Sequence, residues 1–240
     1  MKKFKRYKYV SGAKFVSGHK PDFFKLLRKN INKKDAVLDI GCGSGELTLR
    51  LAGHCKKIIG VDCYDEYIKT AKIDKKEKKI LNAFFKIVDA RNLQFKDEQF
   101  DVVYSSRGPV SANQNFFKEA VRVLKRGGLL IEETIGETNK IELKKIFKRG
   151  QNYPIKIKKE DSVNKLVKKL GAELVYSENF IYYQDFNSLE SVVRTLDRTP
   201  IISDFDEVKD TDNLKKLGKL NEGKGIILSA HRLLWIAKRH

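Results

Sequence analysis

One short stretch of the chain constrains its fold more than any other. Residues 37–46 read VLDIGCGSGE: an apolar run, a turn with glycines at 41, 43 and 45, and then an acidic residue. A buried strand that runs into a glycine-rich turn and a helix is typical of a parallel sheet whose backbone approaches a ligand closely. A dinucleotide-binding turn would have its third glycine at position 46, where this chain has Glu46. The turn is therefore close to a nicotinamide site but departs from one.

Strands and helices alternate on both sides of this turn. A first helix is expected from Pro21 to Asn30, and further helices over 45–54, from 65 onward and over 113–124. Strands are expected over residues 35–40, 57–61, 83–88, 100–104 and 129–134, with Lys125–Gly128 ending the preceding helix. This alternation predicts an α/β fold: an open, doubly wound, mostly parallel sheet with helices on both faces.

The last third of the chain departs from this strict alternation of strands and helices. Helices are expected over 138–149 and 161–170, and strands over 173–186 and 225–238. The polar stretch 187–224 lies between these two strands and is predicted to be a helical lid or substrate cap rather than a second domain. We therefore treat residues 1–240 as a single domain with an insertion.

The chain is strongly basic. It has 50 Lys and Arg against 31 Asp and Glu, a formal net charge of +19 and a pI near 9.7. Such a field attracts polyanions, so RNA, DNA and acidic membrane surfaces are candidate partners, although compositional bias explains the charge equally well. Residues 1–30 are expected to form a basic N-terminal arm and helix. Five Lys or Arg within residues 1–9 alternate with aromatic residues, which suits either an unstructured arm or one that binds nucleic acid.

Cysteine usage and hydropathy limit the class of protein further. Cys42, Cys55 and Cys63 are odd in number and lack C-x-x-C spacing, so neither a zinc site nor a disulfide framework is expected. No run approaches the roughly 18 apolar residues of a membrane span, and the N-terminus lacks the features of a secretory signal. These features predict a cytoplasmic protein with free thiols.

Polar residues follow the strands at the edge where open parallel sheets bind ligands. Asp62 lies 21 positions beyond Gly41, a spacing that suits a carboxylate accepting hydrogen bonds from ribose hydroxyls. Asp89 follows the third strand and can accept from an adenine amine, while Ala90 can offer a backbone amide. Together these groups indicate a nucleoside site that does not require a pyrophosphate.

The ordered segments VLDIGCGSG, VDCYDEY, VDARNLQF, FDVVYSS and EAVRVLKRGGLLI closely resemble the motifs of class I, Rossmann-like S-adenosylmethionine (SAM)-dependent methyltransferases, over about residues 35–135. The resemblance is to the small-molecule-type (methyltransferase type 11-like) branch. It implies a seven-stranded sheet with an antiparallel last strand, SAM as cofactor and S-adenosylhomocysteine as product.

The resemblance also implies a set of cofactor-binding residues. The turn would cradle the methionine and ribose of SAM, Asp62 would hold the ribose beside Cys63, Asp89 and Ala90 would read adenine, and the residues after the fourth strand would face the methionine and the acceptor. The full set is Asp39, Gly41, Cys42, Gly43, Ser44, Gly45, Asp62, Cys63, Asp89, Ala90, Ser105 and Ser106.

The acceptor side carries weaker signals. After the fourth strand the chain reads SSRGPV (residues 105–110) in place of the Asn/Asp-Pro-Pro-Tyr-like motif of many nucleic-acid amine methyltransferases. Candidate substrate-pocket residues are His19, Arg107, Glu133 and Tyr153, with Tyr183 and His231 as further general-base candidates. His231 alternates with apolar residues and is interpreted as structural, and no catalytic base is assigned.

These observations favour a small-molecule acceptor. An RNA (tRNA or rRNA) methyltransferase is the alternative, supported by the charge and the basic N-terminus. A non-catalytic nucleic-acid-binding protein with a methyltransferase fold is a further hypothesis. A NAD-dependent oxidoreductase is disfavoured by Glu46.

Overall fold

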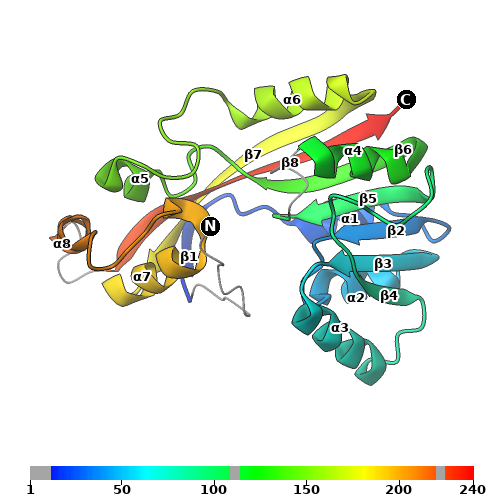
Figure 1. Cartoon of the computed structure of the whole chain (residues 1–240), viewed down its shortest axis with the longest axis horizontal. Helices are drawn as coiled ribbons and strands as arrows, with labels where there is room; N and C mark the ends of the chain where they lie inside the picture. Colours follow the sequence, from blue (N-terminus) through cyan, green and yellow to red (C-terminus); the bar gives the residue numbers. More distant parts are fainter. Residues whose placement is uncertain (1–11, 109–113, 220–224) are drawn as a thin grey trace. The chain divides into compact units, whose positions relative to one another are not determined.

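The computed structural model describes residues 12–108, 114–219 and 225–240. Eight strands form one mixed sheet in the order β1-β7-β8-β6-β5-β2-β3-β4 (Figure 1). The chain divides into two compact units. The larger unit comprises residues 21–134, 160–178 and 233–240, and the smaller unit comprises the remaining described residues.

The larger unit contains the parallel part of the sheet. Strand β2 lies between β3 and β5, so Leu38 has Ile59 as its neighbour on one side and Val103 on the other. The pairs β3–β4 and β5–β6 are parallel too, whereas β1 and β7 pair antiparallel at the other end of the sheet. The strands are β1 (Lys14–Gly18), β2 (Ala36–Ile40), β3 (Lys57–Asp62), β4 (Ala83–Ile87), β5 (Phe100–Ser106), β6 (Leu124–Ile135), β7 (Ala172–Phe186) and β8 (Ile226–Arg239). The predicted fold class is confirmed.

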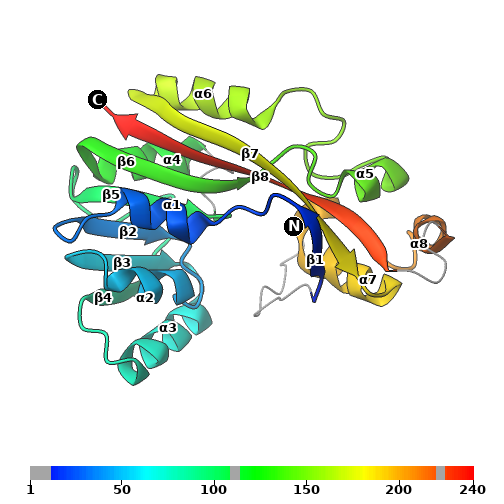
Figure 2. The ribbon, with the colours of Figure 1, turned by 180° about the vertical axis from the view of Figure 1, so that it is seen from behind.

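Helices lie on both faces of this sheet. Figure 2 shows α1 and α2 on the near face, and Figure 1 shows α4 on the opposite face. Asp22 caps α1 by accepting a 2.9 Å hydrogen bond from the backbone amide of Lys25. The helices of this unit are α1 (Phe23–Asn30), α2 (Glu46–Ala52), α3 (Asp65–Glu77), α4 (Gln114–Val123) and α6 (Lys159–Lys169).

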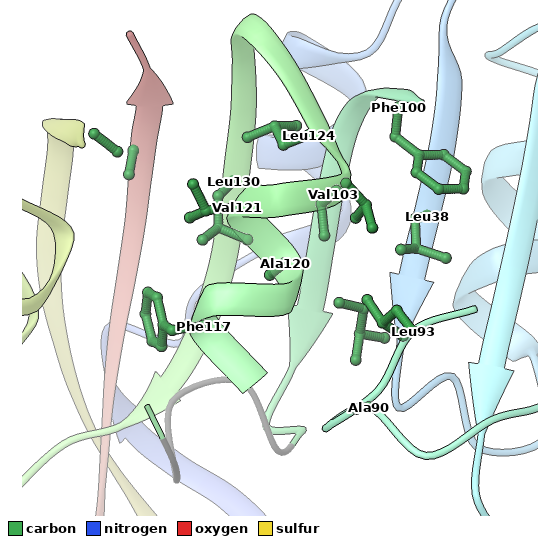
Figure 3. Packing of buried hydrophobic residues seen from close by; sticks show 14 of the residues in the cluster. Leu38, Ala90, Leu93, Phe100, Val103, Phe117, Ala120, Val121, Leu124 and Leu130 are labelled. Carbon is green, nitrogen blue, oxygen red and sulfur yellow. The ribbon is translucent and has the colours of Figure 1, made fainter. Parts of the chain in front are cut away.

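The core of the larger unit forms where α4 packs on the sheet. Figure 3 shows Phe117, Ala120 and Val121 on one side of α4, beside Leu130 and other side chains of the sheet. Phe117 stacks on Trp235 of β8, with ring centroids 5.5 Å apart. This buried apolar layer fixes the strands from which the loops of the sheet edge emerge.

The smaller unit has a separate apolar core. It contains α5 (Ile141–Phe147), α7 (Leu189–Arg198), a 3₁₀ turn η2 (Pro200–Ile202) and α8 (Thr211–Lys219). Leu143 and Phe147 of α5 pack with Val192 and Leu196 of α7 and with Ile202. The stretch expected as an insertion therefore has helices and shares a core with α5. Its role as a lid stays a prediction.

Three details differ from the sequence-based expectations. Strand β1 was not expected, and it adds an eighth strand beyond β7. Strand β5 continues through Ser106, and β6 begins at Leu124 rather than at residue 129. Leu124 is buried and pairs with Phe100 before the register shifts, so Lys125–Gly128 is a bulged part of the strand rather than a helix stop. The basic stretch 1–9 and Pro109 lie outside the described residues.

Candidate functional site

The glycine turn after β2 has a backbone that other residues rarely adopt. Gly41, Gly43 and Gly45 have φ angles of 76°, 53° and 79°. At Gly45, an added Cβ would lie 2.6 Å from the Phe85 ring and 2.9 Å from the Ala71 side chain. Glycine is therefore required there by conformation and by space, and its presence lets the turn lie tightly against β4 and α3.

Gly43, unlike Gly45, has free space where a side chain would begin. An added Cβ at this residue would have no atom within 4 Å, so the turn leaves open space on this side. The Gly43 amide donates a 3.0 Å hydrogen bond to Asp62 Oδ2, and Oδ1 of the same carboxylate accepts from the Tyr64 amide at 3.1 Å. The structure thus brings Asp62 against the glycine turn, with one lone pair of each oxygen still open.

Asp39 lies beneath the turn. Only 2% of the residue is exposed, and its carboxylate accepts from Thr48 Oγ1 at 2.5 Å and Tyr104 Oη at 2.8 Å. Burial raises the pKa of Asp39 to about 7, against the opposing effect of these two hydroxyls. Both hydroxyls bond to Oδ2, so the side chain joins β2, α2 and β5 from beneath the turn.

The cysteines of the predicted site are packing or surface groups. Cys42 is half-buried, and its Sγ lies 2.9 Å from the position that a Cβ on Gly60 would take. Burial, with the charges of Asp39 and Asp62, raises the pKa of Cys42 well above its ordinary value, so the thiol stays protonated. Cys63 is exposed at the end of β3, and Ser44 is half-buried within the turn.

Asp89 follows β4 and is paired with Arg91, a partner that was not among the predicted site residues. The Arg91 guanidinium contacts its carboxylate with Nη2–Oδ2 at 2.5 Å and Nε–Oδ1 at 3.0 Å. Hydrogen bonds from Arg91 lower the pKa of Asp89, which keeps it ionised. The spacing of Asp89 and Arg91, two residues apart in a turn, is the feature of the sequence that could have predicted this ion pair. Ala90 is buried in the core of the larger unit.

The two serines of β5 have different surroundings. Ser105 is fully buried and donates to the backbone carbonyl of Ile40 at 2.8 Å, so its hydroxyl links β5 to β2. Ser106 donates to Glu133 Oε2 at 2.7 Å. Arg107 Nε lies 3.4 Å from the same oxygen, and the Arg107 amide donates to the Glu133 carbonyl at 2.8 Å. Ser106, Arg107 and Glu133 therefore form one cluster at the carboxyl ends of β5 and β6.

The other acceptor-side candidates belong to the smaller unit and take no part in this cluster. His19 is exposed, and its amide donates to the Ile181 carbonyl at 3.1 Å. Tyr153 is half-buried, and Tyr183 is exposed on β7.

His231 is a hydrogen-bonded structural histidine in this unit. Its Nδ1 lies 2.7 Å from Thr138 Oγ1 and its Nε2 lies 2.8 Å from Asn179 Oδ1, while burial lowers its pKa. With both ring nitrogens engaged, His231 has no nitrogen available to a substrate.

Two further results concern the described part of the chain. It contains no group of three or more His, Cys, Asp or Glu side chains placed to hold a metal ion. None of the helices within it combines the length and the apolar character needed to cross a lipid bilayer.

The sequence is similar to known methyltransferases. A demethylmenaquinone methyltransferase of Lactobacillus johnsonii is 36% identical over 138 residues, which are 52% of this chain and 53% of that protein. The uncharacterized methyltransferase YcgJ of Bacillus subtilis is 34% identical over 95 residues, or 38% of this chain and 37% of that protein. For the first three curated relatives, the match spans between 36% and 39% of their length.

Solved structures have the same fold. The structure of YcgJ superposes with a TM-score of 0.65 and 17% identity, covering 91% of this chain and 98% of that chain. A SAM-dependent methyltransferase of Methanosarcina mazei superposes with a TM-score of 0.56 and 20% identity, covering 89% and 96%.

A protein-family model matches two thirds of the sequence. The methyltransferase domain family matches residues 31–190, which are 160 of the 240 residues and include the glycine turn, Asp62, Asp89 and the Ser106 cluster. The chain therefore belongs to the methyltransferase domain family.

Proposed function

We propose that this protein transfers a methyl group from SAM, bound on the glycine turn, to a small-molecule acceptor. The observation that carries the proposal is the open side of Gly43, whose amide is held by Asp62. A turn with room beyond its backbone and a carboxylate beside it suits a ligand that has both an amino-acid part and a ribose. The residues present therefore fit the cofactor.

The roles of the residues follow from their hydrogen-bonding capacity. Asp62 has lone pairs left on both carboxylate oxygens, so it can accept from two ribose hydroxyls while it keeps its bonds to the turn. Asp89 is exposed and ionised, so it can accept from the adenine amine beside its bond to Arg91. Asp39, Thr48 and Tyr104 hold the turn from below.

SAM supplies a methyl group that its sulfonium already activates for in-line displacement. The chain's task is then to hold the acceptor in line and to keep water away, since positioning alone lowers such a barrier substantially. Glu133 fixes Arg107 and accepts from Ser106 at the carboxyl ends of β5 and β6. We assign Arg107 to bind an anionic or polar group of the acceptor, with Glu133 as its positioning residue and Ser106 Oγ as a hydrogen-bond partner.

The small-molecule acceptor has two supports. One similar protein is named as acting on demethylmenaquinone, a small molecule. The stretch after β5 also lacks the Asn/Asp-Pro-Pro-Tyr-like motif. RNA is the second candidate because of the net charge of +19. Incubation with methyl-labelled SAM and separate RNA and small-molecule fractions distinguishes the two candidates. We expect label in the small-molecule fraction; label in RNA would favour an RNA acceptor instead. The cytoplasmic location stays a prediction.

Isothermal titration calorimetry with SAM and S-adenosylhomocysteine tests the cofactor assignment. We expect both to bind, and we expect Asp62→Ala to lower the affinity at least 30-fold because two hydrogen bonds to a charged group, about 1.5–3 kcal/mol each, are lost. Glu77→Ala removes the same charge from the exposed end of α3 and is expected to bind as the wild type does. The absence of heat at millimolar ligand, or equal affinity of both variants, would contradict the assignment.

A further inference from the structure

A basic cleft lies on the larger unit, on a face of β3 and β4 that no described helix covers in Figure 1. Its volume is about 400 Å³, and it is lined by Lys57 and Ile59 of β3, Phe84 and Lys86 of β4, and Phe95 and Lys96 of the following loop. A cleft of this size is within the range of small-ligand pockets. The cleft differs from the cofactor site in its face of the sheet: Lys86 pairs with Val61, but strand alternation places its side chain on the face opposite Phe85, whose ring lies at the glycine turn. Lys57, at the other end of the cleft, is about 16 Å along β3 from Asp62.

The strand register explains why this face is open. Ile59 pairs with Phe84 and Gly60 pairs with Phe85, so the two phenylalanines point to opposite faces of the sheet. Phe85 is buried and faces the glycine turn, where its ring lies 2.6 Å from the Cβ position of Gly45. Phe84 is 42% exposed. Residues 88–99 then connect β4 to β5 without a helix, which leaves the cleft uncovered.

Positive charge gathers around the Phe84 ring. Lys57 Nζ lies 5.0 Å and Lys75 Nζ 4.7 Å from its centroid, so the two ammonium groups are within about 10 Å of each other. Lys86 Nζ lies 5.3 Å from the Phe95 centroid. Across the ranges that the structure describes, no carboxylate forms an ion pair with Lys57, Lys75, Lys86 or Lys96. These ammonium groups are therefore available to the phosphates of an anionic ligand, which would displace their counterions.

We propose that this cleft, defined by Lys57, Phe84, Lys86, Phe95 and Lys96, binds single-stranded RNA. Phosphates of the backbone contact the lysines, and a base takes the place of one of the two ammonium groups that lie over the exposed Phe84 ring. A basic groove with aromatic faces is the arrangement that suits an unpaired strand. Several ammonium groups in one cleft exceed the charge of one phosphodiester, which favours a chain of nucleotides over a single one. The proposal does not depend on the methyl acceptor being RNA, since the cleft and the cofactor site are separate.

Fluorescence anisotropy with a fluorescein-labelled ten-residue oligouridylate, measured without SAM at several KCl concentrations, tests the proposal on the full chain. The variant Lys57→Gln/Lys86→Gln/Lys96→Gln should bind at least tenfold more weakly at 100 mM salt. The slope of log K against log[salt] should also be about 2 less steep for this variant, since each of the three lost phosphate contacts contributes roughly 0.7 to the slope for a single strand. Phe84→Leu should weaken binding at least fivefold and leave the slope unchanged.

The matched control is Lys165→Gln/Lys168→Gln/Lys169→Gln, which removes the same charge from exposed positions of α6 in the same unit. We expect it to change affinity less than threefold. Equal losses in the two triple variants, or no effect of Phe84→Leu, would overturn the proposal, because binding would then depend on net charge alone. Stronger binding of uridine monophosphate than of the oligomer would overturn it as well. Circular dichroism melts confirm that each variant is folded, and cofactor calorimetry separates this result from the proposed function.

Discussion

At the scale of single residues, Gly43 and Gly45 differ in what surrounds them although both have positive φ. An alanine at Gly45 would collide with Phe85 and Ala71, whereas an alanine at Gly43 would enter open space. We expect Gly45→Ala to lower the free energy of unfolding by about 2–4 kcal/mol, and Gly43→Ala by about 1 kcal/mol. Gly43→Ala should nevertheless reduce SAM affinity more than tenfold, because its methyl group fills the space assigned to the cofactor. Urea denaturation and calorimetry measure the two effects, and unchanged SAM affinity in Gly43→Ala would exclude that side of the turn as the cofactor site.

At the scale of elements, Asp39 couples β2, α2 and β5 through Thr48 and Tyr104. Burial raises its folded-state pKa from 3.8 to about 7, so between about pH 4 and 7 the folded chain holds a proton that the unfolded chain has lost. The stability that this proton contributes is complete below pH 4 and is lost as the pH rises towards 7. Wild type should therefore lose on the order of 2 kcal/mol of unfolding free energy from this group between pH 5 and pH 7, whereas Asp39→Asn, which cannot titrate there, should not. The difference in stability between variant and wild type should shift in favour of the variant by that amount. Urea titrations at both pH values measure this, with Glu66→Gln on α3 as control. Parallel pH profiles for wild type and Asp39→Asn would contradict it.

At the scale of the whole molecule, each of the two units has an apolar core among its described residues, so we expect a cavity in one unit and a cavity in the other to affect SAM binding differently. Leu196 is fully buried in the smaller unit, and Leu38 is fully buried beside Asp39 in the larger unit. Replacing either with alanine should cost about 2–5 kcal/mol of stability. Leu196→Ala should leave SAM affinity within twofold of wild type, whereas Leu38→Ala should lower it, because β2 carries the glycine turn. Loss of SAM binding in folded Leu196→Ala would show that the smaller unit supports the cofactor site.

The sequence by itself determined the α/β alternation, the parallel sheet and the polar residues that follow its strands. Apolar periodicity and glycine position are local signals, and VLDIGCGSG, Asp62 and Asp89 are each placed by the strand that precedes them. Periodicity alone did not predict β1, which carries no buried residue and depends on pairing with β7. It also missed the start of β6, because Leu124 is drawn into the sheet by its pairing with Phe100.

Only the tertiary structure decided what each polar side chain contacts. Ser105 and Ser106 are adjacent in sequence, yet the Ser105 hydroxyl donates to the Ile40 carbonyl and the Ser106 hydroxyl donates to Glu133. The reason is that successive side chains of a strand point to opposite faces. The opposite exposures of Phe84 and Phe85, and hence the basic cleft, follow from the same alternation together with the helices that cover only one face there. Contacts of this kind join residues far apart in the chain. Their energies depend on distance and burial, which local sequence patterns do not contain.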